Sequence, residues 1–167
     1  MFNFERKSEL GLDIDIENKY DKTFNAICEM LENREIKYDI VPHKEVKNVI
    51  VFRGNLKGFF LHTVVFIDAE KDIFKFECTL PIEVSPEYKH VIAETLCLIN
   101  SQLMNGSFNW NLKDNISFQI AQYIFDSAIG MSDIETIFSI MIATVQGYTE
   151  KIFAVSKGYI TPINAIQ

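Results

Sequence analysis

Hydrophobic and polar residues alternate near the start of the chain. Between positions 9 and 17, leucine and isoleucine occupy the even positions, and glycine, aspartate and glutamate occupy the odd ones. A period of two predicts a strand with one apolar face, or a short arm packed on the surface. The pattern then changes, and apolar residues at helical spacing predict a helix over 19–33 whose buried face carries Tyr20, Phe24, Ile27, Cys28 and Leu31.

Four strands are predicted next, each rich in valine, isoleucine and phenylalanine. They cover 36–41, 46–53, 58–68 and 72–80. Short turns separate them, and a parallel crossover would need about a dozen residues. The four strands are therefore expected to form antiparallel hairpins.

In the second half of the chain, the sequence predicts a helix, a β-hairpin and a last helix. A serine cap and Pro86 predict a helix start at 85–87, and Asn105-Gly106 predicts its end. Strands are predicted at 108–112 and 116–121. A capping box at 132–135 predicts a last helix that reaches about 156 and is ended by Gly158. The tail 159–167 is apolar enough to dock.

This order is α-β-β-β-β-α-β-β-α, which predicts an α+β fold with helices mainly on one face of an antiparallel sheet. We expect one domain over 1–167, because the length suits one and no linker or repeat is visible. Its parts are an N-terminal arm or extra strand at 1–18, a core at 19–158 and a C-terminal tail at 159–167.

The strand at 58–68 is apolar on both faces. A three- or five-residue turn at 68–72 would place Phe66 opposite Phe74, so the even positions would join the core. The odd positions, together with two residues of the preceding strand, are then predicted to form an outward apolar surface for a partner or a dimer. Its residues are Ile50, Phe52, Phe59, Leu61, Val65 and Ile67.

Three covers for such a surface stay open at this point. The chain's own termini could lie on it, a second copy could cover it as a two-fold homodimer, or an extended segment of another protein could dock there.

The net charge of the chain argues against some classes of function. The chain carries 16 Lys+Arg and 23 Asp+Glu, so its net charge is −7. An acidic chain without a basic stripe is not expected to bind nucleic acid. No apolar run approaches the roughly 18–20 residues that span a bilayer, and no signal peptide is visible at the start, so we expect a cytoplasmic protein with no membrane partner.

The junctions between elements resemble those of the bacterial YbjN family. The resemblance is carried by the first amphipathic helix and by four later segments, FECTLPIEVSPE at 76–87, LIN at 98–100, the hairpin 106–120 and VSKG at 155–158. That family is labelled a sensory transduction regulator, and its fold is similar to that of type III secretion chaperones. The resemblance implies a small binding or regulatory protein with no catalytic residues to carry over.

Candidate chemistry in the sequence is weak, so no catalytic, metal or cofactor site is predicted. The histidines 43, 62 and 90 match no metal motif, and His62 is read as an interior residue; Cys28, Cys78 and Cys97 form no paired motif and are read as buried. The carboxylates at 13, 15 and 17 lack calcium-loop spacing. The segment 54–58 is read as a hairpin turn rather than a phosphate loop.

The leading hypothesis is a non-enzymatic, YbjN-like protein that binds another protein and forms a homodimer. The alternative is a small-molecule-binding or enzymatic α+β domain whose site lies between sheet and helices. A pocket with converging polar groups would favour this alternative.

Overall fold

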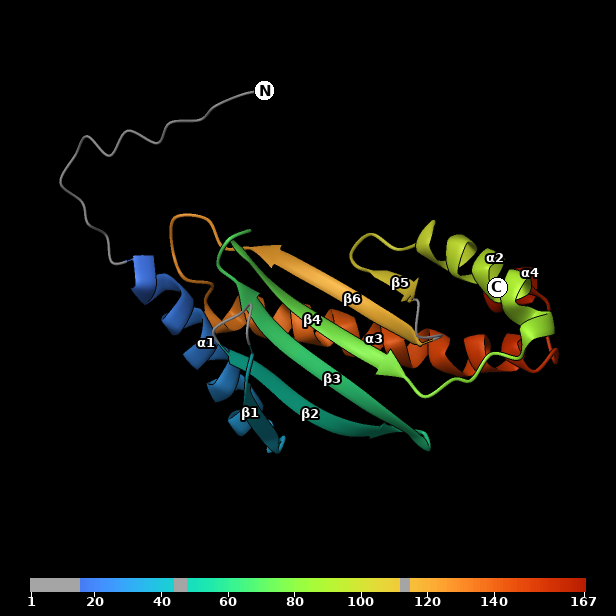
Figure 1. The fold of residues 1–167 in the computed structure, drawn as a ribbon, viewed down its shortest axis with the longest axis horizontal. Coiled ribbons are helices and arrows are strands. Elements are labelled where there is room, and N and C mark those ends of the chain that lie inside the picture. Colours follow the sequence, from blue (N-terminus) through green and yellow to red (C-terminus); the bar gives the residue numbers. More distant parts are fainter. Residues whose placement is uncertain (1–15, 44–47, 112–114) are drawn as a thin grey trace, which may run out of the picture.

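Six strands form one antiparallel sheet in the computed structural model, which describes residues 16–43, 48–111 and 115–167 (Figure 1). The strand order is β1-β2-β3-β4-β6-β5. The strands run over Tyr38–Pro42 (β1), Asn48–Leu56 (β2), Phe59–Asp68 (β3), Ile73–Leu80 (β4), Ser107–Trp110 (β5) and Ile116–Tyr123 (β6). The predicted class, an antiparallel α+β fold, is confirmed.

Two helices cover one face of the sheet. They are α1 (Ile16–Asn33) and α3 (Met131–Ser156), and both lie behind the strands in Figure 1. Ring contacts fix α3 to the sheet: Phe138 lies 6.1 Å from Phe52 and 5.9 Å from Phe76, centroid to centroid. The hydrophobic core therefore lies between the sheet and these two helices.

The other helices gather at the β5 end of the sheet. A 3-10 turn, η1 (Pro86–Tyr88), leads into α2 (Lys89–Asn100), and the short α4 (Pro162–Ala165) packs near α2 and α3. Ala165 is fully buried in the core cluster. The apolar tail thus docks, as its composition suggested.

Several local predictions need correction. Positions 16 and 17 belong to α1, so the alternating pattern does not continue as a strand to 17, and positions 9–15 lie outside the described residues. The second helix ends at Asn100 rather than near 105. The last helix begins at Met131 with Gly130 as its N-cap, and no side chain caps it.

Gly106 and Gly158 both have positive φ, but for different structural reasons. Gly158, with φ of 72°, follows α3 and ends it as predicted. Gly106, with φ of 76°, lies at the start of β5 instead of at a helix end. A Cβ there would come within 2.4 Å of the Phe118 ring and 2.7 Å of the Gln119 carbonyl oxygen. Glycine is therefore required for the close approach of β5 to β6.

The predicted register of β3 and β4 is wrong by one residue. Ile67, not Phe66, is opposite Phe74, and Val65 is opposite Phe76. The cause is the turn, which has four residues between the paired Asp68 and Ile73 rather than three or five. A one-residue shift moves every side chain of a strand to the opposite face.

Candidate functional site

The six residues predicted as a partner or dimer surface lie on the helix-covered face. Five of them, Ile50, Phe52, Leu61, Val65 and Ile67, are buried in the core. The sixth, Phe59, is half-buried and packs edge-on against Phe153 of α3 at 5.6 Å. This correction follows from the register, and the cover is α1 and α3 rather than a terminus, a second copy or another protein.

The opposite face of the sheet is the one that no helix of the described residues covers, and it is turned toward the viewer in Figure 1. We call it the open face. Its apolar residues come from β2, β3 and β4, and Phe60 is the most exposed of them, at 74%. Val51, Val64, Phe66 and Ile73 are half-buried.

Charged side chains of both signs surround the apolar part of the open face. Lys75 forms an ion pair with Glu77 at 3.2 Å, and its ammonium group lies 5.6 Å from the centroid of the Phe66 ring. On the neighbouring strand Arg53 is opposite His62. The open face is therefore apolar along β2 and β3, with charged side chains of both signs on the adjoining β4 and at Arg53.

The histidines and cysteines, for which no catalytic or metal-binding role was predicted, are spread over the molecule. His62 is half-buried on the open face, so its reading as an interior residue is wrong, while His43 and His90 are exposed. Cys78 is buried as predicted, Cys28 is half-buried, and Cys97 is exposed, against prediction. Burial raises the pKa of Cys78 to about 11.

Metal-ligating residues do not gather in the part of the chain that the structure describes, where no three histidine, cysteine or carboxylate side chains meet. Asp13 and Asp15 lie outside the described residues, as does the side chain of Glu17. In the segment 54–58, which was predicted as a hairpin turn, residues 54–56 continue β2, and Lys57 and Gly58 form the turn with positive φ.

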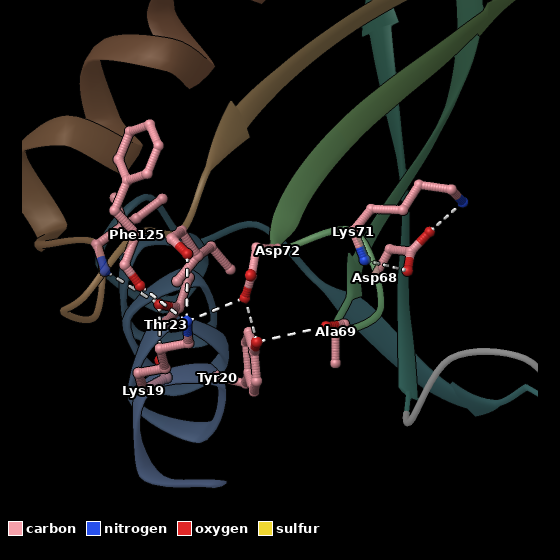
Figure 2. Close-up of polar contacts among 10 residues, drawn as sticks. Lys19, Tyr20, Thr23, Asp68, Ala69, Lys71, Asp72 and Phe125 are labelled. Carbon is pink, nitrogen blue, oxygen red and sulfur yellow. Dashed lines mark hydrogen bonds and ion pairs between the residues drawn. The ribbon is translucent and has the colours of Figure 1, made fainter. Parts of the chain in front are cut away.

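A polar cluster that the sequence did not reveal joins α1 to the sheet (Figure 2). The Lys19 ammonium donates to the Asp72 carboxylate at 2.9 Å and to the carbonyl oxygens of Phe125 at 2.8 Å and Ile124 at 3.3 Å. The Tyr20 hydroxyl donates to the same carboxylate and to the Ala69 carbonyl oxygen. We call Lys19, Tyr20 and Asp72 the α1 clamp.

The electrostatics of the α1 clamp raise the pKa values of Lys19 and Tyr20 and so favour the protonated forms of these two groups. Burial alone would lower the pKa of Lys19, but the hydrogen bonds to Asp72 and Tyr20 outweigh it and raise that pKa. Burial, followed by the hydrogen bond to Asp72, raises the pKa of Tyr20. The arrangement holds α1 against the β3–β4 turn.

A groove of about 260 Å³ lies between β6 and α3, beside the N-terminal end of β5. We call it the β6-edge groove. Ile120 and Gln122 of β6 and Ile137 and Ile140 of α3 form its sides, with Asn105, Gly106, Ala121, Asp133 and Thr136 around them. Its volume is below the roughly 300–1,000 Å³ of ordinary ligand pockets. It therefore gives little support to the alternative of a small-molecule site.

Solved structures of two proteins resemble the chain over most of its length. One is YbjN, a proposed transcription regulator from E. coli, at a TM-score of 0.57 and 11% identity, covering 83% of this chain and 94% of that one. The other is ExsC in its complex with ExsE, at a TM-score of 0.57 and 9% identity, covering 78% and 93%. The fold is YbjN-like and chaperone-like.

The comparison with solved structures is the one that supports the YbjN-like fold. No protein-family model matches the sequence, and no curated protein matches it. ExsC is a type III secretion chaperone and was solved with a protein partner. Across the described residues, none of the helices is both long and apolar enough to cross a bilayer.

Proposed function

We propose that the chain is a non-enzymatic protein-binding or regulatory protein that works as a single cytoplasmic domain. The observation that carries the proposal is the open face, a sheet surface with an apolar patch along β2 and β3, while the core lies on the opposite, helix-covered face. Contiguous apolar patches on monomers are commonly interaction sites. The regulator and the chaperone among its structural neighbours agree with this role.

We further propose that the open face binds a second copy of the chain, giving a two-fold homodimer. In such an interface the same patch meets itself, so it must be self-complementary. The mixed charges of the open face make it self-complementary, because Arg53 and Lys75 on one copy can meet Glu77 and Asp68 on the other. A uniformly acidic patch, as the net charge of −7 might suggest, would repel itself.

Light scattering behind a sizing column tests the homodimer. We expect a mass of twice the 19.3 kDa of one chain, held across a range of protein concentrations. Phe60→Asp places a charge on the open face, next to the β2–β3 turn, and is expected to shift the mass toward 19.3 kDa. Tyr159→Asp is the matched control, because Tyr159 is also 74% exposed but lies after α3, outside the open face.

Two outcomes would contradict the homodimer. One is a mass of a single chain at every concentration, and the other is an equal effect of Phe60→Asp and Tyr159→Asp. Circular dichroism of both variants checks that each is folded, so that a lower mass reports the interface and not unfolding.

A further inference from the structure

The sheet has an incomplete edge at β6. On its outer side β6 pairs with β5, whose first residue, Ser107, is opposite Gln119. Ala121 and Tyr123 therefore lie beyond the N-terminal end of β5 and have no strand partner on that side among the described residues. The glycine at 106 turns the chain away at this point, with a φ of 76°.

The hydrogen-bond alternation of β6 shows which groups this leaves open. The Ile124 amide donates to the Asp72 carbonyl at 2.7 Å, so the even positions of β6 bond toward β4. The Asn111 amide donates to the Asn115 carbonyl at 3.0 Å, so the odd positions bond toward β5. By the same alternation, the main-chain groups of Ala121 and Tyr123 point outward, along the β6-edge groove.

The β6-edge groove has the shape and chemistry to take one more strand. On the helix side its lining is apolar, with Ile120 and Ile137 buried and Ile140 half-buried. On the other side Ala121 and Tyr123 are exposed toward the open face. A strand placed here would bury alternate side chains against α3 and leave the others in solvent.

We propose that the chain's own N-terminal arm, residues 9–15, fills the β6-edge groove as this strand. The sequence of this arm alternates apolar residues (Leu10, Leu12 and Ile14) with glycine and aspartate (Gly11, Asp13 and Asp15). This alternation matches a groove that is apolar on the side of α3 and open to solvent on the other side. This inference goes beyond the proposed function and does not depend on the open face.

The attachment of the arm supports the same occupant. Residue 16 begins α1, and Lys19, one turn later, bonds the carbonyl oxygens of Ile124 and Phe125, which follow β6 directly (Figure 2). The α1 clamp thus places the end of the arm near the open end of the groove. Seven extended residues span about 23 Å and four residues of β6 about 13 Å, so the arm is long enough with chain to spare.

A covered edge also has a physical advantage. Unpaired amide and carbonyl groups at a sheet edge are a template for pairing with other chains, and folded proteins cover or blunt such edges. The arm would close the second half of the β6 edge in the way β5 closes the first half.

Amide hydrogen exchange on the full chain tests the proposal. We expect the Ala121 and Tyr123 amides to be protected in the wild type and to exchange roughly tenfold faster or more in Leu12→Asp, which puts a charge against the isoleucines. Asp13→Ser, one residue away on the solvent side, is the matched control and should keep the protection. The Ser117 and Gln119 amides, paired with β5, should stay protected in all three proteins.

Two results would overturn the proposal. If Ala121 and Tyr123 exchange at the same fast rate in the wild type and Leu12→Asp, the arm does not occupy the groove. If they are protected but the protection survives Leu12→Asp or disappears on dilution, a second copy or another segment covers the edge.

Discussion

At the residue scale, the two glycines at 106 and 147 should respond in opposite ways to alanine. Gly106 has a φ of 76°, and a Cβ there would meet the Phe118 ring and the Gln119 carbonyl, so Gly106→Ala is expected to cost about 2 kcal/mol or more. Gly147 lies inside α3 with open space around it, so Gly147→Ala should gain about 0.5–1 kcal/mol. Urea unfolding measures both, and equal stability of Gly106→Ala and the wild type would contradict the close approach.

Residue-scale signals in the sequence were useful where they depend on local geometry. Pro86 was predicted to begin a helical segment and Gly158 to end one, and both do so. The capping box at 132–135 was not formed, because Gly130 takes the cap position and the Thr136 hydroxyl instead bonds the Ser132 carbonyl.

At the element scale, the α1 clamp should determine how firmly α1 is held. Lys19→Met keeps most of the aliphatic stem and removes the ammonium group, leaving the Asp72 carboxylate with Tyr20 and two carbonyl oxygens without this donor. We expect a loss of about 1–2 kcal/mol in the free energy of unfolding, since the site is partly exposed. Lys22→Met is the control, because Lys22 is exposed one turn along α1.

The clamp experiment has a clear contrary result. If Lys19→Met and Lys22→Met lower the urea midpoint equally, the hydrogen bonds of Lys19 contribute no more than a surface charge. If Lys19→Met alone lowers it, faster amide exchange in the first turns of α1 is expected to accompany the loss.

Elements were easier to predict than the way they pair. The helix stripe at 20–31 and the valine- and isoleucine-rich strands gave the helices and strands nearly in place, because burial on one face imposes a period on the sequence. The register of β3 and β4 depended on a single turn residue, Asp72, which has a φ of 54° and is bonded to Lys19 from 53 positions away. Since no local pattern encodes that contact, the wrong face of β3 was assigned as the partner surface.

At the scale of the whole molecule, the perturbed pKa values predict a loss of stability in alkaline solution. Burial raises the pKa of Cys78 from 9.0 to about 11, and the pKa values of Lys19 and Tyr20 are also raised. A group whose pKa is higher in the folded state holds its proton there longer than in the unfolded chain. Its contribution is complete below the unfolded value and is lost as the pH rises through the folded one.

For Cys78 the window therefore runs from about pH 9 to about pH 11, and the loss is on the order of 2–3 kcal/mol across it. Urea unfolding at pH 8 and at successive steps to pH 10.5 measures this loss. Cys78→Ala should flatten the decline, whereas Cys97→Ala should leave it unchanged, because Cys97 is exposed. Parallel pH profiles for Cys78→Ala and the wild type would mean that the buried thiol does not drive the alkaline loss, which would then belong to the other groups whose pKa is raised, Lys19, Tyr20, Cys28 and Tyr38.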